Sequence, residues 1–277
     1  MKKSYEKAQR RKEGGVSYKH DLGQHFLYDE ALLSALVKST GVSKEDNVLE
    51  IGPGSGMLTR ELCREAGQVI AVEVDQDVLP YLRVKTEECD NLAIVVGDIR
   101  KQPIHELCQP LGDDFFVIAN IPYNITTPIF DLLWESKLPI RQISVMVQKE
   151  VADKLAAKPG DAAYGLLSAR CSYYCEAEIE AIVPAEAFTP PPKVDSAFIH
   201  LRMRKEPIAP VTNEKLLMRM IKDGFGHRRK TLTNALKGIV DSQLLTQAMD
   251  SLGLLPTARA EELSMESWIA LSNACAR

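Results

Sequence analysis

The sequence lacks long apolar runs and paired cysteines. A membrane-spanning helix needs about 20 consecutive apolar residues, and no segment of the chain approaches that length. The opening run MKKSYEKAQRRKEGG has no apolar stretch after its charges, as a secretory signal would have. The six cysteines form no CxxC pair, so we expect reduced, mostly buried thiols, with a zinc site as the minor alternative. Together these features predict a cytoplasmic protein without a metal.

An excess of positive charge is also lacking, because 34 Lys and Arg residues are opposed by 38 Asp and Glu residues. The net charge of -4 does not suggest a nucleic-acid-binding protein, but the distribution of charge does. Residues 1–20 carry +5 and residues 184–240 carry +6, whereas residues 21–183 carry -12. Basic patches attract polyanions even on an acidic protein, although many charge runs are only solvated faces. Charge alone leaves both interpretations open.

Short apolar segments alternate with amphipathic segments through the first half of the chain. We predict strands at 47–51, 69–74, 92–96, 115–119 and 143–147, and helices at 29–38, 58–64, 78–88, 129–135 and 149–157. Strands this apolar are covered on both faces, so the pattern predicts an α/β fold with a parallel sheet. The alternating segment 196–204 predicts an antiparallel strand with one exposed face that closes the sheet.

The second half of the chain predicts a separate helical region. A linker that contains Pro207 and Pro210 precedes helices expected at 213–225, 230–237, 242–252 and 265–274. The predicted organisation is a basic flexible arm at 1–19, an α/β domain at 20–206 and a small all-helical domain at 207–277. We expect a monomer.

A glycine-rich loop follows the first predicted strand. Gly52, Gly54 and Gly56 allow a tight turn and close approach of a ligand to the backbone. The dinucleotide fingerprint GxGxxG is absent, because Met57 follows Gly56. Glu73, 21 residues after Gly52, ends the next strand and could accept ribose hydroxyl groups of any adenosine cofactor.

Two further acids favour S-adenosylmethionine over a nicotinamide cofactor. Asp98 ends the third strand and could accept the exocyclic amino group of the cofactor's adenine, although a helix N-cap would explain it equally well. Glu50 precedes the glycine loop, where a negative charge suits a sulfonium cation and opposes a pyrophosphate. Ligands of such folds bind beyond the carboxyl ends of the strands, where these residues converge.

The fourth strand ends in the turn Asn120-Ile121-Pro122-Tyr123, which predicts methylation of an adenine amino group. The lone pair of that nitrogen is delocalised into the ring, so a transferase must hold its hydrogens with acceptors. The Asn120 side-chain oxygen and the Ile121 carbonyl are suited to this, Pro122 fixes the backbone, and Tyr123 can stack on a flipped base. A proline turn with a buried tyrosine is the structural alternative.

Taken together, these motifs closely resemble those of the KsgA-type ribosomal RNA small-subunit adenine dimethyltransferases, over about residues 20–240. The resemblance is carried by LGQHFL at 22–27, the loop at 50–56, Glu73, Gly97-Asp98, the turn at 120–123, VQKEVA at 147–152, FTPPPKVDS at 188–196 and FGHRRKTL at 225–232. It implies a Rossmann-like class I methyltransferase sheet with a small carboxy-terminal all-helical domain. It also implies dimethylation of two adjacent adenosines near the 3′ end of 16S rRNA in the assembling 30S subunit.

The resemblance assigns roles to individual residues. Cofactor contacts fall on His25, Leu27, Gly52, Gly54, Glu73, Asp98 and Asn120. Phe188 is placed beside the target base, with packing against the prolines as the alternative, and Arg228, Arg229 and Lys230 open a helix suited to phosphate contact. The family usually has Asn at the position of His25, and a protonated imidazole would oppose a sulfonium. We therefore expect weaker cofactor binding at acidic pH, checked by affinities between about pH 5.5 and 8.

Three alternatives compete with this interpretation. The related class that methylates adenine in 23S rRNA and confers macrolide resistance shares the glycine loop and the turn, but does not usually combine the segments at 188–196 and 225–232. A non-catalytic assembly or transcription factor on the same fold would tend to lose the loop or the turn, and both are intact. An NAD-dependent dehydrogenase is disfavoured by Met57 and by the lack of a convincing hydride-transfer site.

Overall fold

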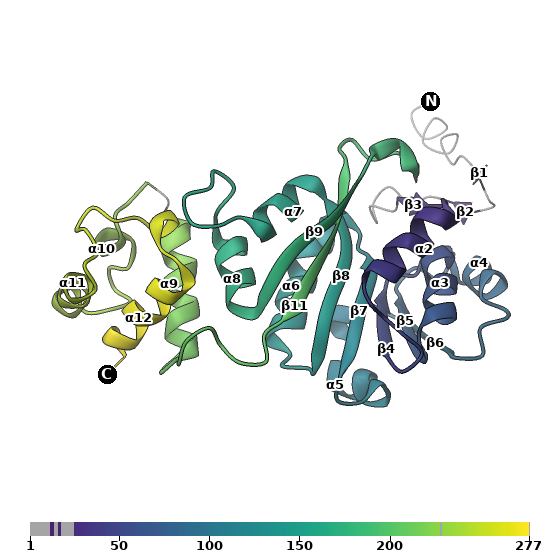
Figure 1. The fold of residues 1–277 in the computed structure, drawn as a ribbon, viewed down its shortest axis with the longest axis horizontal. Helices are drawn as coiled ribbons and strands as arrows, with labels where there is room; N and C mark the ends of the chain where they lie inside the picture. Colours follow the sequence, from purple (N-terminus) through teal and green to yellow (C-terminus); the bar gives the residue numbers. More distant parts are fainter. Residues whose placement is uncertain (1–11, 14–15, 18–24, 228, 277) are drawn as a thin grey trace, which may run out of the picture. The chain divides into compact units, whose positions relative to one another are not determined.

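The computed structural model describes residues 12–13, 16–17, 25–227 and 229–276, which form two compact units (Figure 1). The first, here called the sheet unit, comprises the described residues up to Ala152 together with Glu178–Arg202. The second, here called the helical unit, comprises Asp153–Ala177 and the described residues from Met203 onward. Within the predicted arm, β1 (Lys12–Glu13) pairs antiparallel with β2 (Val16–Ser17), and the rest of the arm lies outside the described residues.

A seven-stranded sheet organises the sheet unit in the order β6-β5-β4-β7-β8-β11-β9. Its strands are β4 (Asn47–Ile51), β5 (Gln68–Glu73), β6 (Leu92–Val96), β7 (Phe115–Asn120), β8 (Ile140–Gln148), β9 (Cys175–Val183) and β11 (Ser196–Met203). The strands from β6 to β8 are parallel to their neighbours, and β11 is antiparallel to β8. A small second pair joins β3 (Phe26–Leu27) to β10 (Phe188–Thr189). The predicted parallel sheet is confirmed.

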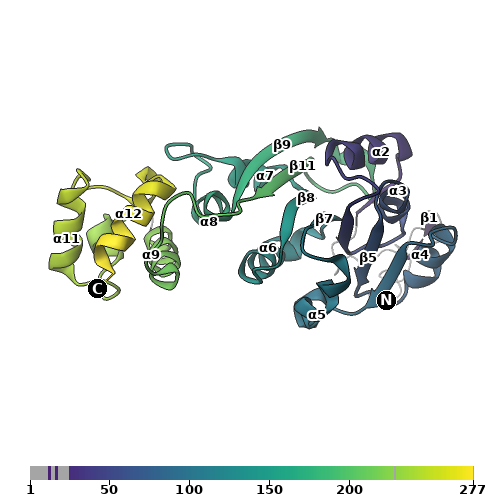
Figure 2. The same cartoon turned by 60° about the horizontal axis from the view of Figure 1, so that its bottom comes forward.

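Helices cover both faces of this sheet, which explains its apolar strands. They are α2 (Glu30–Ser39), α3 (Met57–Glu65), α4 (Leu79–Lys85), α5 (Ile104–Cys108), α6 (Thr126–Glu135) and α7 (Lys149–Ala156). Figure 2 shows α2 and α3 on one face and α5 and α6 on the other. Residues of β4 and β7 such as Val48, Leu49 and Val117 are fully buried between these layers. Burial of a side chain of this size contributes about 1.5–3 kcal/mol, so the layers fix the sheet.

The prediction of an exposed face on the antiparallel strand is wrong for most of the strand, although Arg202 near its end is exposed. Ser196 and His200 of β11 are buried, and β9, which the sequence did not predict, lies outside β11 as the edge strand. The polar side chains are accommodated because they bond one another: Ser144 Oγ lies 2.9 Å from His200 Nδ1, and Ser39 Oγ lies 3.3 Å from His200 Nε2. Burial lowers the pKa of His200 below its ordinary value. The alternating pattern thus marks a polar network inside the sheet unit.

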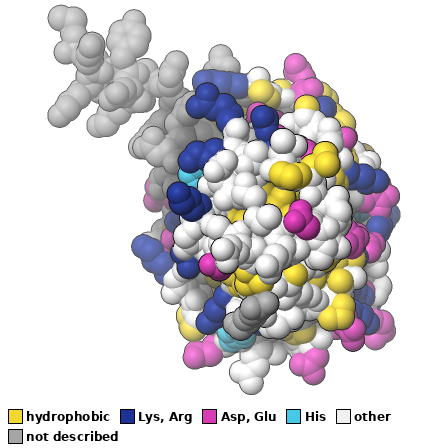
Figure 3. Space-filling model, turned by 90° about the vertical axis from the view of Figure 1, so that its left-hand side faces the viewer, with side chains coloured by type: hydrophobic (Ala, Val, Ile, Leu, Met, Phe, Trp, Pro, Cys, Tyr) yellow, Lys and Arg dark blue, Asp and Glu magenta, His cyan; other side chains and the backbone are white. Residues whose placement is uncertain are grey.

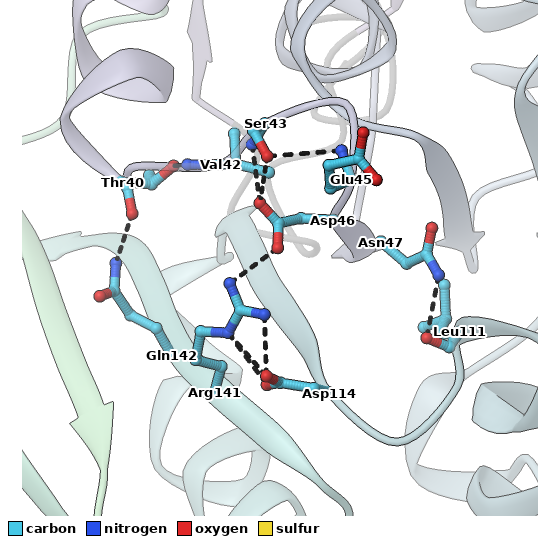
Figure 4. Close-up of polar contacts among 10 residues, drawn as sticks. All are labelled: Thr40, Val42, Ser43, Glu45, Asp46, Asn47, Leu111, Asp114, Arg141 and Gln142. Atoms are coloured by element: carbon cyan, nitrogen blue, oxygen red, sulfur yellow. Dashed lines mark hydrogen bonds and ion pairs between the residues drawn. The ribbon is translucent and has the colours of Figure 1, made fainter.

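An ion-pair network fixes the amino-terminal ends of the parallel strands (Figure 4). Arg141 of β8 donates from Nη2 to Asp114 Oδ2 at 2.8 Å and from Nη1 to Asp46 Oδ1 at 2.7 Å. Burial alone would raise the pKa of Asp46, but hydrogen bonds from Ser43 and Arg141 hold it below its ordinary value. The loops at this end are therefore tied together, and the carboxyl ends of the strands are left for a ligand.

The helical unit has its own core. It contains α8 (Leu166–Tyr174), α9 (Glu214–Gly226), α10 (Leu232–Ala235), α11 (Ser242–Ser251) and α12 (Met265–Cys275). The unit differs from the predicted domain 207–277 by including the α8 region. The reason is packing: Tyr164 and Ala169 are buried in one cluster with Leu217 and Trp268, and Tyr164 Oη donates to Leu263 O at 3.0 Å. None of the described helices has the length and apolar character that crossing a bilayer requires.

Candidate functional site

The carboxyl ends of the parallel strands meet at one cavity of the sheet unit. β4 leads into Gly52, β5 ends at Glu73, β6 leads to Asp98 and β7 ends at Asn120. Because the four strands run parallel, these residues lie at one edge of the sheet, as the sequence predicted. All four line a cavity of about 230 Å³, together with His25, Phe26, Leu27, Leu33, Leu36, Glu50, Gly54, Met57, Val74, Ile99, Arg100, Ile121, Pro122, Tyr123, Met146 and Phe198.

The glycine loop is shaped by Glu73 and by Phe26. Gly54 has a φ of +55°, and a β-carbon placed on it would lie 2.5 Å from Phe26 Cε1. Only glycine fits a left-handed turn pressed against a ring in this way. Gly54 N–H donates to Glu73 Oε2 at 2.9 Å, and Asp75 N–H donates to Glu73 Oε1 at 2.8 Å. Each carboxylate oxygen keeps a further lone pair for a ribose hydroxyl.

The Glu50 carboxyl is the most strongly perturbed acid that lines the cavity. Its side chain is 1% exposed, and its Oε2 has no hydrogen-bond partner among the described residues. Burial is the main cause that raises the pKa of Glu50 to about 8; the nearby Glu73 carboxylate adds to this increase, and Thr59 opposes it. Burial also raises the pKa of Glu73. A buried acid without a partner is costly, and a cationic ligand would relieve that cost.

Asp98 is engaged by a neighbour that the sequence analysis did not single out. Arg100 donates from Nε to Asp98 Oδ1 at 2.9 Å and from Nη2 to Asp98 Oδ2 at 2.7 Å. Asp98 also caps the short helix that follows by accepting from Arg100 N–H at 3.0 Å. The Arg100 side chain holds the pKa of Asp98 below its ordinary value. The helix N-cap interpretation is therefore correct for Asp98 Oδ1, and Asp98 also lines the cavity.

The Asn120 amide has a defined orientation. Its Nδ2 donates to the backbone oxygen of His25 at 2.9 Å, which turns Oδ1 away from that carbonyl. The amide assignment follows from this bond, because a carbonyl oxygen can only accept. Pro122 continues the turn with a φ of -55°, and its Cδ would lie 3.7 Å from a β-carbon on Gly52. The turn and the glycine loop are therefore direct neighbours.

The Tyr123 ring is held by two segments far away in the sequence. It stacks on the His25 ring with a centroid separation of 5.4 Å and an interplanar angle of 23°. Its hydroxyl oxygen lies 2.5 Å from Ser196 Oγ. His25 is fixed in turn, because its Nδ1 lies 2.7 Å from the Pro190 carbonyl oxygen and must therefore carry a proton. Burial raises the pKa of Tyr123, so the phenol stays neutral.

The structure differs from two of the predictions made for individual residues. Phe188 is 2% exposed and packs in the core with Leu27 and Val183, and its ring does not line the cavity. This position favours the packing alternative over contact with a base. Arg229 and Lys230 are exposed but precede α10, so the prediction that they open a helix is wrong. Arg228 lies outside the described residues.

Arg100 and Ser196 belong to the site and were not identified from the sequence. Arg100 follows Asp98 by two residues, a spacing at which a local ion pair could have been anticipated. Ser196 gives no local signal, because its contact with Tyr123 spans 73 residues. Within the described part of the chain, no three His, Cys, Asp or Glu side chains form a group able to hold a metal ion.

The strand order and this edge define a Rossmann-like methyltransferase fold. The chain belongs to the ribosomal RNA adenine dimethylase family, whose model matches residues 15–277. Ribosomal RNA small subunit methyltransferase A from Bacillus mycoides is 42% identical over 268 residues, which are 94% of this chain and 92% of that protein. The protein of the same name from Bacillus anthracis has the same identity and coverage.

Two solved structures share the fold over most of its length. The 23S rRNA methyltransferase ErmE has a TM-score of 0.69 and 28% identity, covering 90% of this chain and 99% of that one. A dimethyladenosine transferase from Plasmodium falciparum has a TM-score of 0.76 and 24% identity, covering 89% of this chain and 96% of that one. The 42% identical relatives are therefore nearer in sequence than the 23S enzyme.

Proposed function

We propose that this protein uses S-adenosylmethionine to dimethylate the N6 amino groups of two adjacent adenosines near the 3′ end of 16S rRNA in the assembling 30S subunit. The observation that carries the proposal is the fixed amide of Asn120 at the edge of the cavity, next to the glycine loop. The family and the names of the 42% identical relatives support the small subunit as the source of the substrate. Such a substrate places the enzyme in the cytoplasm.

The cavity fits S-adenosylmethionine by the chemistry of its lining. The Glu50 carboxyl, whose Oε2 has no hydrogen-bond partner among the described residues, suits a cation, and Gly54 leaves the backbone open to close approach. Glu73 retains acceptor capacity for a ribose, and Asp98 for an amino group. The apolar residues Leu27 and Ile99 line the same space and suit the faces of an adenine. When bound, this cofactor supplies a methyl group on a sulfonium centre.

The residues of the turn prepare the nucleophile. Asn120 Oδ1, oriented by the bond from Nδ2 to His25, is suited to accept one hydrogen of the adenine amino group. The Ile121 carbonyl is the second acceptor in the proposal, and Pro122 limits its backbone freedom. When two acceptors hold the amino hydrogens, the nitrogen becomes pyramidal. Its lone pair is then less delocalised into the ring and can attack the methyl group. Tyr123 provides a ring face for the base, so the turn positions and polarises the amino group and needs no strong base.

Basic side chains of the helical unit are suited to contact phosphate groups. Lys215, Arg219 and Lys222 are exposed on α9 at spacings of four and three residues, which place them on one face. Arg229 and Lys230 are exposed just beyond this helix. In the view of Figure 3, Lys and Arg side chains gather toward the left of the picture, and others lie at its right edge. We propose that these residues bind rRNA backbone, with the protein acting as a monomer.

The test compares Asn120→Ala with Asn47→Ala. Asn120→Ala is expected to lower the rate of methyl transfer to unmethylated 30S particles by about a hundredfold or more, because one acceptor is lost. Binding of the variant to the particles is expected to stay within a few-fold of wild type. Asn47 donates to Leu111 O at the opposite end of the sheet, so Asn47→Ala should retain transfer (Figure 4). The modified bases are mapped by mass spectrometry.

The second candidate, a 23S rRNA methyltransferase, is supported by the likeness to ErmE. Parallel reactions with 50S precursors separate the two. If 50S particles are labelled and 30S particles are not, the proposed substrate is wrong. If Asn120→Ala retains full activity, the proposed role of Asn120 in the mechanism is wrong.

A further inference from the structure

The Tyr123–Ser196 contact joins the turn after β7 to the start of β11. Because β11 is antiparallel to β8, its first residue lies at the edge where the parallel strands end. Ser196 pairs in register with Gln148, the last residue of β8. The strand pairing thus brings the Ser196 hydroxyl to Tyr123, which lines the cavity, although Ser196 itself does not.

Burial makes this hydroxyl pair a strong constraint on the ring. The Ser196 side chain is fully buried, and Tyr123 is half-buried. A buried hydroxyl without a partner costs about 1–3 kcal/mol, so each group holds the other in place. The His25 ring restrains the plane of Tyr123 by stacking, whereas Ser196 restrains its position within that plane. Neither contact touches the cofactor-binding acids Glu73 and Asp98.

The segment that supplies Ser196 also holds His25. Pro190 accepts from His25 Nδ1–H, and Ser196 bonds Tyr123, so two groups within seven residues fix both stacked rings. A ring that serves as a platform for a base needs this restraint, because a misplacement of about 1 Å can slow a reaction about a hundredfold. We propose that Ser196 is a positioning residue for methyl transfer, which it supports by holding Tyr123 in the orientation that receives the target base. This inference rests on the function proposed above.

The test is a double-mutant cycle with Ser196→Ala, Tyr123→Phe and the combined variant, on unmethylated 30S particles. Each single change is expected to lower kcat about tenfold, while the KM for S-adenosylmethionine and the affinity for the particles stay within about twofold. The combined variant is expected to match the single variants, because both changes remove the same contact.

Ser144→Ala is the matched control. Ser144 is a fully buried serine on the neighbouring strand β8 whose hydroxyl bonds His200 instead of the turn. This control is expected to lower the unfolding temperature and leave kcat unchanged. If Ser196→Ala folds poorly, Tyr123→Phe still tests the contact, since it removes only a hydroxyl from a half-buried ring.

A kcat of Ser196→Ala within twofold of wild type would overturn the inference, as would losses that multiply in the combined variant. An equal loss of kcat in Ser144→Ala would also overturn it, because the effect would then follow from core stability. Absence of methyl transfer by the wild-type protein overturns the proposed function instead, so the two failures are distinguishable.

Discussion

Asp98 has to serve two partners if its proposed contact with the cofactor is correct. The carboxylate already accepts two side-chain hydrogen bonds from Arg100, whose guanidinium also lines the cavity. One of these hydrogen bonds must be broken or shared when the amino group of the cofactor's adenine approaches Asp98. Arg100→Met is therefore expected to tighten binding of S-adenosylhomocysteine by roughly twofold to fivefold, since exposed ion pairs are weak. Isothermal titration calorimetry measures the change.

The control for this prediction is Lys101→Met, which removes the same charge from the next residue. Lys101 is exposed, and its positive charge lowers the pKa of Asp98, while its backbone N–H donates to the Asp98 carbonyl oxygen in either variant. Its removal should leave the affinity near that of wild type. Weaker binding by Arg100→Met would show that Arg100 itself holds the cofactor and would contradict the prediction.

At the residue scale, the sequence indicates which side chains belong to the site but not the contacts between them. Gly52, Glu73, Asp98 and Asn120 could be placed together because the ends of parallel strands always share an edge. The contact of His25 with Pro190 spans 165 residues, and no local pattern encodes such an approach. Phe188 shows the same limit, because only tertiary packing shows its ring in the core.

At the scale of elements, α9 and α12 meet at a glycine. A β-carbon on Gly224 of α9 would lie 2.7 Å from Trp268 Cη2 and 3.4 Å from Ala260 Cβ. Alanine normally stabilises a helix relative to glycine by about 0.5–1 kcal/mol. Here the clash outweighs that gain, so Gly224→Ala is expected to lower the free energy of unfolding of the helical unit by about 1–3 kcal/mol.

Denaturation followed by Trp268 fluorescence in a Trp134→Phe background measures this change, because the chain has two tryptophans and Trp134 belongs to the sheet unit. Gly226→Ala is the matched control, since a β-carbon at the end of the same helix meets no atom within 4 Å. That variant should be neutral or slightly stabilised. A stabilised Gly224→Ala would mean that Trp268 can move aside at no cost.

Element prediction from the sequence succeeds for the short apolar strands β4 and β6, which both have the predicted bounds. β4 has the predicted bounds because four of its five residues are buried and apolar segments of that length read as strands. β11 also has nearly the predicted bounds, but its polar residues were expected in solvent. The alternating pattern shows which residues are polar, but it does not show whether they are exposed. Polar side chains that bond one another, as His200 and Ser144 do, can be buried. α8 and β9 were missed altogether.

At the scale of the whole molecule, the two units should respond differently to pH. The acids with raised pKa values at the cavity, Glu50 and Glu73, belong to the sheet unit. The paired Asp46 acts in the opposite direction, because its lowered pKa gives stability that is lost as the pH falls through the acidic range. Because the chain comprises two compact units, a single unfolding free energy does not describe it. Each tryptophan therefore has to be followed separately.

Glu50→Gln tests the raised pKa through the stability of the sheet unit. The carboxyl has a pKa of about 8 in the folded protein against 4.5 for the free group, so the unfolded chain loses the proton first as the pH rises. The contribution of Glu50 is therefore fully present below pH 4.5 and lost as the pH rises through 8, with a slope of at most about 1.4 kcal/mol per pH unit. The variant should remove this slope and be more stable than wild type near pH 8.

Urea unfolding between about pH 5 and 8.5, followed by Trp134 fluorescence in a Trp268→Phe background, measures the effect. Glu45→Gln is the control, because Glu45 is exposed in the loop before β4 and its removal should leave the curve unchanged (Figure 4). The buried Asp46 and His200 are present in both proteins, so their effects cancel. The difference in stability between Glu50→Gln and wild type therefore reports the titration of Glu50 and its electrostatic coupling to Glu73. Parallel curves for the two proteins would show that Glu50 is already ionised in the folded sheet unit.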